Sequence, residues 1–518
     1  MASTLAQHWL SPFQKAGISA DDLAAASPVS RLAEARLCPL IQVLNNRIYI
    51  VADTRMRQLD MQLHRCDSGA VDGDFNENFC PEAMRGKPCR RQQRSWERRR
   101  LQVVLRLLHI AVSRQSLPDF EMRVCVDDTC HGVWEKPRRP RPLFTMAACD
   151  DAPTLPMVQW NAEGPGRDPD LAVWDEMLQK RVAMGRNRVE AEAWACRAAT
   201  AVFRGSANQL HTYNNDWSRS GHTRRVRTTH TNFNASGRWA LVSRKLQSPN
   251  LLDVRLSVLR RGESILGEQY DPALFKRRVD AVSSDEPAHM SIVDQAERFK
   301  YILHIEGHGG WADRLKHLLP LGVAVLKQDS GVREWFEPLM VPGFHFMTVQ
   351  SDLTNLTAAA GWAKLNDRLS RSTAIRALNL AERLLPLPVI TEYATALFQG
   401  YARLMRFVPK RHESAVHYRC WPATVNRSLD GCADHPLSGR QLTDCALVDE
   451  SVEDAESGPP QRTFATLRAA TSSFRGTPFS ARGSLPPHDS ITRREGDAKQ
   501  SRPLGRPCIT PGTVDAYK

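Results

Sequence analysis

The fold is decided by residues 301–330, YILHIEGHGGWADRLKHLLPLGVAVLKQDS. Residues 301–305 predict a buried strand, and the glycine-rich residues 307–310 predict a tight turn. Residues 311–319 predict a helix that ends at Pro320 and Gly322, and residues 323–326 predict a second buried strand. A strand, a helix and a second strand in this order form a βαβ unit, which implies a parallel sheet. The sequence therefore predicts an α/β fold.

Further elements are predicted on both sides of this unit. They are short strands at 46–52 and 122–126, a helix at 96–112, a long helical stretch at 174–203, and mostly helix from 353 to 411. The turn at Arg204-Gly-Ser206 follows the long helical stretch, and we place a domain boundary there. After about residue 412, Ser, Pro, Gly, Thr and Arg dominate without periodicity, which predicts a weakly ordered tail.

Composition narrows the class of protein. The chain has 518 residues, of which 42% are hydrophobic, so it has material for two or three domains and is neither collagen nor disordered throughout. A net charge of +13 favours anionic partners such as phosphates, nucleic acid or acidic lipids. No window approaches the roughly 18 uninterrupted apolar residues of a membrane span. The first residues lack the basic and apolar regions of a signal peptide.

The cysteines leave the redox compartment open. Twelve cysteines are too few for a miniprotein built on disulfides, yet Cys66, Cys80 and Cys89 lie close together in a loop-like stretch. A few disulfides are therefore permitted, and none is required.

The glycine turn at 307–310 is a candidate phosphate site. Backbone N–H groups at the start of a helix hold anions, and Arg314 could add a bidentate contact. The run matches neither of the common nucleotide-binding glycine motifs, and the carboxylate of Asp313 would repel a phosphate. A purely structural turn is the competing interpretation.

Other polar residues have simpler interpretations. His304, Glu306 and His308 lack the spacing of a zinc site, so we predict no metal. Asp127 and Asp128 end a predicted strand, where one of them could serve as a general base or could cap the next turn. The basic runs at 98–100, 136–141 and 224–227 are short and scattered, so a solvated basic face is favoured over nucleic-acid binding.

An ordered series of motifs resembles the Rumi-like protein O-glucosyltransferases and the related capsule-associated and KDEL-containing glycosyltransferases. The series consists of residues 117–128, 203–206, 241–245, 301–316, 325–330, 334–338 and 352–353. Each motif is modest, and their shared order is specific. A long basic insertion from Asn208 to Ser236 departs from the family pattern.

The resemblance implies a GT-B fold, in which two Rossmann-like domains face a cleft. The expected divisions are an N-terminal extension at 1–29, an acceptor-side domain at 30–205, a UDP-sugar-binding domain at 206–412, and a mostly disordered tail at 413–518. Family membership also implies the lumen of the endoplasmic reticulum or Golgi. Because no signal peptide is visible, a cytoplasmic protein or a truncated gene stays an alternative.

The resemblance also assigns roles to residues. Asp128 matches the catalytic base, and Ser206 and Arg238 match residues that contact the donor. The donor-binding loop matches Gly309, Gly310, Trp311, Ala312, Asp313 and Arg314.

The expected reaction is transfer of glucose or xylose from a UDP-sugar to a hydroxyl of a protein or glycan, with inversion. No cofactor and no nucleic-acid partner are expected. No metal is expected either, because arginines and a helix N-terminus would stabilise the UDP leaving group. The alternative is a catalytically weak member that binds nucleotide or glycan without transfer.

Overall fold

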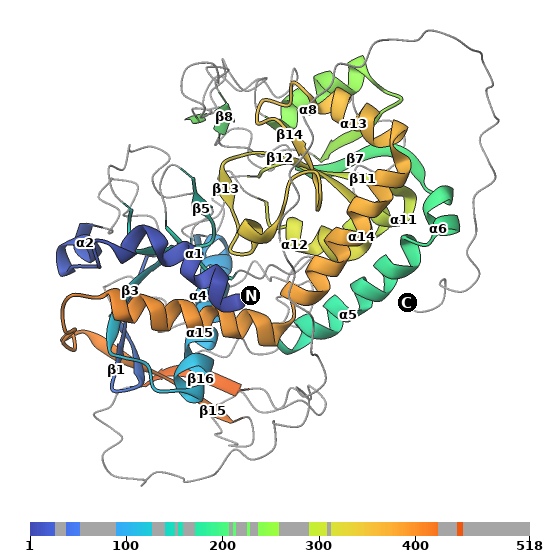
Figure 1. The fold of residues 1–518 in the computed structure, drawn as a ribbon. Coiled ribbons are helices and arrows are strands. Elements are labelled where there is room, and N and C mark those ends of the chain that lie inside the picture. The colour runs from blue at the N-terminus through green and yellow to red at the C-terminus, as the bar shows by residue number, and fades with distance from the viewer. Residues whose placement is uncertain are drawn as a thin grey trace, which may run out of the picture. The chain divides into compact units, whose positions relative to one another are not determined.

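The computed structural model describes residues 1–25, 38–51, 90–126, 140–150, 154–158, 171–206, 211–213, 225–227, 237–257, 290–307, 312–422 and 443–448. All of these ranges belong to one unit, Met1–Asp449. Two larger sheets organise it, one parallel and one mixed. The fold is therefore α/β, as the sequence predicts (Figure 1).

The parallel sheet contains the decisive segment. In the described part of the chain it has five strands in the order β10-β7-β11-β12-β14. Their bounds are Leu252–Ser257, Ala198–Ser206, Phe299–His304, Ala324–Gln328 and Met347–Val349. Strands β11 and β12 pair in parallel, with Tyr301 opposite Ala324, which confirms the predicted parallel pairing. Every residue of these two strands is buried, as expected for a parallel sheet covered on both faces.

Helices surround this sheet. They are α5 (Leu171–Arg188), α6 (Ala191–Cys196), α8 (Gly237–Gln247), α11 (Ile292–Arg298), α13 (Leu356–Leu365) and α14 (Asp367–Leu384). Helix α5 approaches the loop before β12 at two glycines, Gly185 and Gly322. A Cβ atom on Gly185 would clash with the carbonyl oxygen of Pro320 and lie 2.9 Å from the nitrogen of Gly322. Glycine at this contact therefore permits the close approach of two backbones.

Two predictions about helices are wrong in part. The stretch predicted to be helical at 174–203 forms α5 and α6 and then becomes strand β7 at Ala198. The helix predicted at 311–319 is shorter in the structure, with α12 at Leu315–Leu318 and a 3-10 turn, η6, at Leu319–Leu321. Pro320 lies in that turn, and Gly322 has a φ of 67°, so the helix cannot continue.

The mixed sheet has seven strands within the described ranges, in the order β16-β15-β2-β1-β3-β4-β6. Their bounds are Thr443–Val448, Ala415–Pro422, Arg47–Val51, Leu40–Leu44, Phe120–Cys125, Leu143–Thr145 and Leu155–Pro156. Strands β3, β4 and β6 are parallel, and the other pairs are antiparallel. Strands β2 and β3 confirm the short strands predicted at 46–52 and 122–126. Helix α4 (Arg90–Arg114) confirms the helix predicted at 96–112.

Short elements complete the described chain. Strand β5 (Ala148–Cys149) pairs with β13 (Val332–Arg333), and η7 (Glu337–Leu339) follows β13. Strands β8 (His211–Tyr213) and β9 (Arg225–Arg227) pair within the predicted insertion. None of the described helices is long and apolar enough to cross a bilayer.

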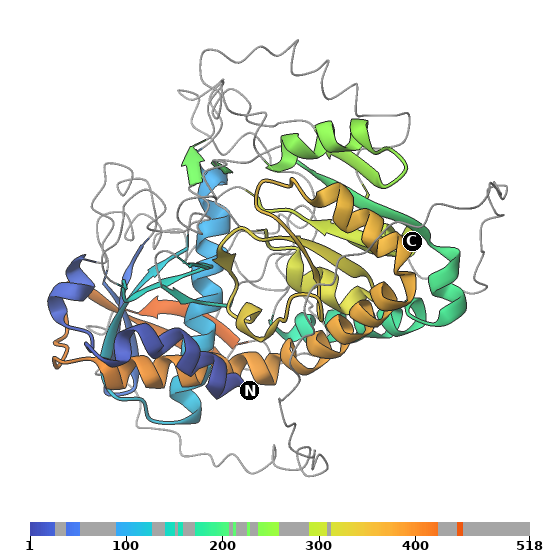
Figure 2. The same ribbon diagram turned by 45° about the horizontal axis from the view of Figure 1, so that its top comes forward.

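Segments from both ends of the unit meet in the core. Helix α1 (Ala2–Gln14) is followed by α2 (Ala20–Ala25), and α1 lies alongside α15 (Leu387–Leu404), as Figure 2 shows. Ile18 donates its backbone N–H to the carbonyl of Leu404. Strand β15 in turn pairs with β2. The domain limits stay a prediction. Helix α1 lies in the predicted N-terminal extension and β15 lies in the predicted tail, so residues of both segments belong to the fold.

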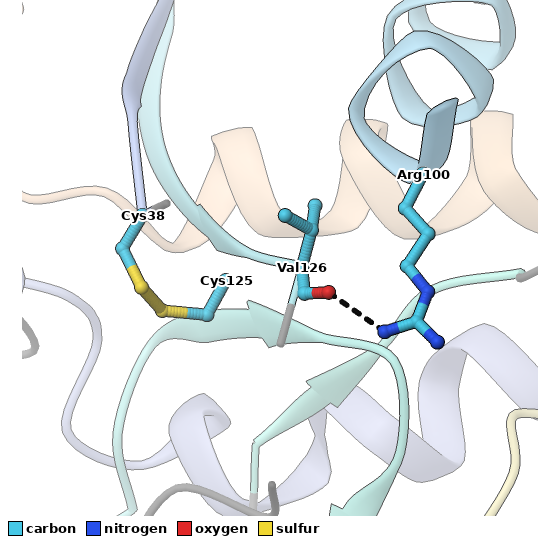
Figure 3. The surroundings of a disulfide bond; sticks show 4 residues. All are labelled: Cys38, Arg100, Cys125 and Val126. Carbon is cyan, nitrogen blue, oxygen red and sulfur yellow. Dashed lines mark hydrogen bonds between the residues drawn. A yellow bond between two sulfur atoms is a disulfide. The ribbon is translucent and has the colours of Figure 1, made fainter. Parts of the chain in front are cut away.

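The end of β3 is held by a disulfide and an arginine (Figure 3). Strands β1 and β3 are antiparallel with Leu40 opposite Arg123, and two further residues of this register place Cys38 opposite Cys125. These two cysteines form a disulfide. The buried Arg100 of α4 donates from Nη1 to the carbonyl oxygen of Val126 at 3.0 Å. The backbone is thereby fixed up to the residue before Asp127.

Candidate functional site

The carboxyl edge of the parallel sheet is the candidate site. Strands β7, β10 and β11 end there at Ser206, Ser257 and His304. Open α/β sheets place ligands at this edge, because loops from several parallel strands meet there. The residues that converge on it decide which ligand is suitable.

Two arginines converge on one aromatic ring at this edge. Arg238 comes from the first turn of α8, and its guanidinium carbon lies 5.7 Å from the ring centre of Phe203. Arg314 is the N-cap residue of α12, and its guanidinium carbon lies 4.9 Å from the same ring centre. Arg238 Nε donates to the carbonyl oxygen of Glu306 at 2.9 Å, and Arg314 Nη2 donates to that of Arg204 at 2.8 Å. We call Phe203, Arg238 and Arg314 the arginine pair site.

The site has a positive electrostatic character. Arg238 is 7% exposed, and burial lowers the pKa of its guanidinium to about 9, with the charge of Arg314 acting in the same direction and Glu306 opposing it. The neighbouring Arg204 forms a 2.7 Å ion pair with Asp253. Two guanidinium groups that meet at one aromatic ring favour an anion that can share them, such as a diphosphate.

A neutral histidine lies at the end of β11. His304 is buried, and its Nδ1 has no hydrogen-bond partner within the described ranges. Burial lowers the pKa of His304 well below its usual value, and the cations Lys327, Arg314 and Arg238 act in the same direction. The ring is therefore uncharged at neutral pH.

Asp313 is engaged with a buried lysine. Lys316 Nζ donates to Asp313 Oδ1 and, at 3.0 Å, to Glu334 Oε2. His317 Nε2 lies 3.8 Å from Asp313 Oδ2. Burial alone would raise the pKa of Asp313, but Lys316 and His317 lower it to about 2. The aspartate is thus an ion whose charge is balanced inside the protein.

The structure brings together some of the predicted site residues. Arg238 and Arg314 meet at Phe203, and Ser206 is the last residue of β7. Ala312 and Asp313 directly precede Arg314, the N-cap residue of α12. The side chain of Ser206 and the residues Asp128, Gly309, Gly310 and Trp311 lie outside the described ranges, so their roles stay predictions.

Sequence reasoning missed two features of the site. The first is Phe203, whose ring both arginines contact. The only signal in the sequence for this role is an aromatic residue directly before the predicted turn at 204–206. The contact between Lys316 and Glu334 joins residues 18 positions apart, and no pattern in the sequence announces it. In the described chain, no group of three His, Cys, Asp or Glu side chains is placed to hold a metal. Metal independence stays a prediction.

A parallel sheet whose carboxyl edge carries the buried Arg238 and the half-buried Arg314 defines an α/β protein with a site suited to an anionic ligand. Sequence comparison places this protein more closely: residues 84–434 match the model of glycosyl transferase family 90, and the chain belongs to that family.

Curated relatives share limited parts of the chain. It is 32% identical over 122 residues to protein O-glucosyltransferase 2 of Danio rerio, which covers 24% of each protein. It is 23% identical over 156 residues to protein O-glucosyltransferase 1 of Homo sapiens, covering 30% of this chain and 39% of the human protein. Uncharacterized protein 179R of Invertebrate iridescent virus 6 is 28% identical over 141 residues, covering 26% of this chain and 11% of the viral protein. The chain therefore matches well under half the length of each of these relatives.

Proposed function

We propose that this protein transfers glucose or xylose from a UDP-sugar to a hydroxyl group of a protein or glycan, with inversion and without a metal. The observation that carries the proposal is the arginine pair site in a member of glycosyl transferase family 90. When the bond between the anomeric carbon and UDP breaks, negative charge develops on the diphosphate. Preorganised guanidinium groups stabilise such charge, because they are oriented before the reaction begins.

The proposed donor-binding residues are Arg238, Arg314, Ser206 and the loop at 309–312. Because α12 has only four residues, the arginines rather than a helix dipole supply the positive charge. The neutral ring of His304 can exchange hydrogen bonds with the donor without adding charge.

Asp128 is the proposed base. It would accept the proton of the acceptor hydroxyl as that oxygen attacks the anomeric carbon from the face opposite UDP. The new glycosidic bond forms as the bond to UDP breaks, so the products are the glycosylated acceptor, UDP and a protonated carboxyl group. We expect Asp128→Asn to abolish transfer and to leave UDP affinity unchanged. Continued turnover in this variant would contradict the assignment.

The test of the function is a donor screen. Release of UDP from UDP-glucose and UDP-xylose is measured with and without protein and glycan acceptors. Transfer from either donor supports the proposal and identifies the sugar. Binding of UDP without release from any donor and acceptor pair would favour the alternative, a family member that binds nucleotide or glycan without transferring it. Failure to bind UDP at all would refute both the proposed transfer and a nucleotide-binding role, and it would leave glycan binding as the alternative.

We further propose a GT-B arrangement and residence in the lumen of the endoplasmic reticulum or Golgi. The disulfide between Cys38 and Cys125 supports the second point, because structural disulfides persist in oxidising compartments. Microscopy of the tagged protein in its own cells, with markers of both organelles, tests it. An exclusively cytosolic signal would refute it.

A further inference from the structure

Three charged side chains next to the arginine pair site form a buried network. The Lys316 ammonium, whose side chain is 1% exposed, lies between the carboxyl groups of Asp313 and Glu334. Asp313 directly precedes Arg314, and Lys316 follows it by two residues. The network therefore holds the backbone on both sides of Arg314.

The far end of the network is attached to the rest of the fold. The backbone N–H of Glu334 donates to Glu337 Oε1 at 3.0 Å, and Lys327 of β12 pairs with Glu337 at 2.9 Å. The carbonyl of Trp335 accepts from the indole of Trp9 in α1 at 2.8 Å. Glu334 is consequently a fixed anchor rather than a surface side chain that follows Lys316.

Arg314 is constrained from two directions. Its carbonyl oxygen accepts from the N–H groups of His317 and Leu318, at 3.0 and 2.9 Å, which sets the first turn of α12. Its guanidinium lies over Phe203 and donates to the carbonyl of Arg204. The network fixes the backbone end of this side chain, and the sheet fixes the charged end.

We propose that Asp313, Lys316 and Glu334 are positioning residues that orient Arg314 for the donor diphosphate, so that Asp313 acts through Arg314 without touching the donor. The proposal rests on the proposed function, since it presumes that a diphosphate binds at the arginine pair. It also explains why a carboxylate is tolerated beside that diphosphate: the ammonium group of Lys316 balances its charge.

The charge of the network depends on pH, because Glu334 can gain or lose a proton. Burial raises the pKa of Glu334 to about 8 despite the opposing charge of Lys316, whereas Asp313 and Glu337 add to the increase. Below that pH, the network holds one ammonium, one carboxylate and one neutral acid, and it leaves the arginine pair positive. Above it, a second carboxylate repels the diphosphate and competes with Asp313 for Lys316.

The test measures UDP affinity by calorimetry in the full chain. Asp313→Asn and Lys316→Met should each weaken UDP binding about tenfold, which is the effect of losing one hydrogen bond to a charged group. The double variant should be no weaker than either single variant, because the residues act as one unit. Asp367→Asn, which breaks the ion pair with Lys300 at the other end of β11, is the matched control and should leave UDP affinity unchanged.

A pH series separates positioning from a general loss of stability. Wild-type affinity for UDP, whose terminal phosphate is ionised above pH 7, should fall as pH rises through about 8. In Glu334→Gln this fall in affinity should be absent, because the amide cannot acquire a negative charge. This comparison does not depend on Lys316→Met, which is the variant at greatest risk of misfolding.

Several outcomes would overturn the inference. Unchanged UDP affinity in Asp313→Asn would do so, as would identical pH profiles for wild type and Glu334→Gln. A loss in Asp313→Asn that is absent in a folded Lys316→Met would mean that Asp313 contacts the donor directly. Wild-type protein that does not bind UDP would refute the proposed function as well, whereas the other outcomes leave that function intact.

Discussion

Removing the disulfide between Cys38 and Cys125 should lower the free energy of unfolding by about 4–5 kcal/mol. The two cysteines are 87 positions apart. A cross-link that closes a loop of this length lowers the conformational entropy of the unfolded chain, which corresponds to about 4–5 kcal/mol of stability. The assay is urea unfolding of Cys38→Ala/Cys125→Ala, followed by tryptophan fluorescence. Each single variant should lose nearly as much as the double variant, because either substitution opens the bridge.

Two results would refute this reasoning. One is a loss below about 1 kcal/mol in the double variant, since the cross-link would then constrain little of the unfolded chain. The other is the detection of free thiols at both positions by mass spectrometry of the unreduced protein. The single variants also serve as internal controls, because a bridge that is absent would give additive rather than equivalent losses.

The remaining predictions concern packing and metal. Gly185→Ala should destabilise the fold by about 1–3 kcal/mol in thermal or urea unfolding, because the added methyl group meets the backbone at Pro320 and Gly322. Gly361→Ala is its control: the nearest atom to the added carbon is 3.7 Å away, so this helical glycine should be replaced without loss, and equal effects of the two substitutions would contradict the packing argument. Transfer from the UDP-sugar should continue after chelator treatment, and a strict requirement for added Mn²⁺ would argue against the metal-free mechanism.

Sequence reasoning succeeded where one segment carried its own structural signal. Residues 301–330 contain two buried apolar runs, a glycine turn and a helix stop. The two apolar runs form β11 and β12, which pair in parallel as predicted. It failed at residues 198–203, where small and apolar residues continue the preceding helical pattern. Periodicity cannot separate a fully buried strand from a buried helix, and β7 is a central strand between β10 and β11. The context of neighbouring strands decided the outcome.

The site shows the same division. Arg238 and Arg314 were predicted from their resemblance to family motifs, and the structure brings them to one aromatic ring. The anchoring of Arg314 depends on Glu334, and the hydrogen bond from Arg314 to Arg204 spans 110 positions. Such contacts arise only when the sheet and its loops are assembled. Local pattern can therefore propose an arginine for the site, but it cannot show what holds that arginine in place.

The packing of α1 on α15 has a consequence for biosynthesis. Arg406, just beyond α15, donates to the carbonyl of Lys15, which is 391 positions earlier. At usual translation rates, this distance takes roughly 20–80 s to synthesise. Throughout that interval α15 has not yet been synthesised, so the apolar residues of α1, such as Leu5, Trp9 and Phe13, cannot pack against it. The strands of the parallel sheet lie between residues 198 and 349 and can assemble earlier. Chaperones that shield exposed apolar helices on the ribosome would therefore be needed for the longest time at α1.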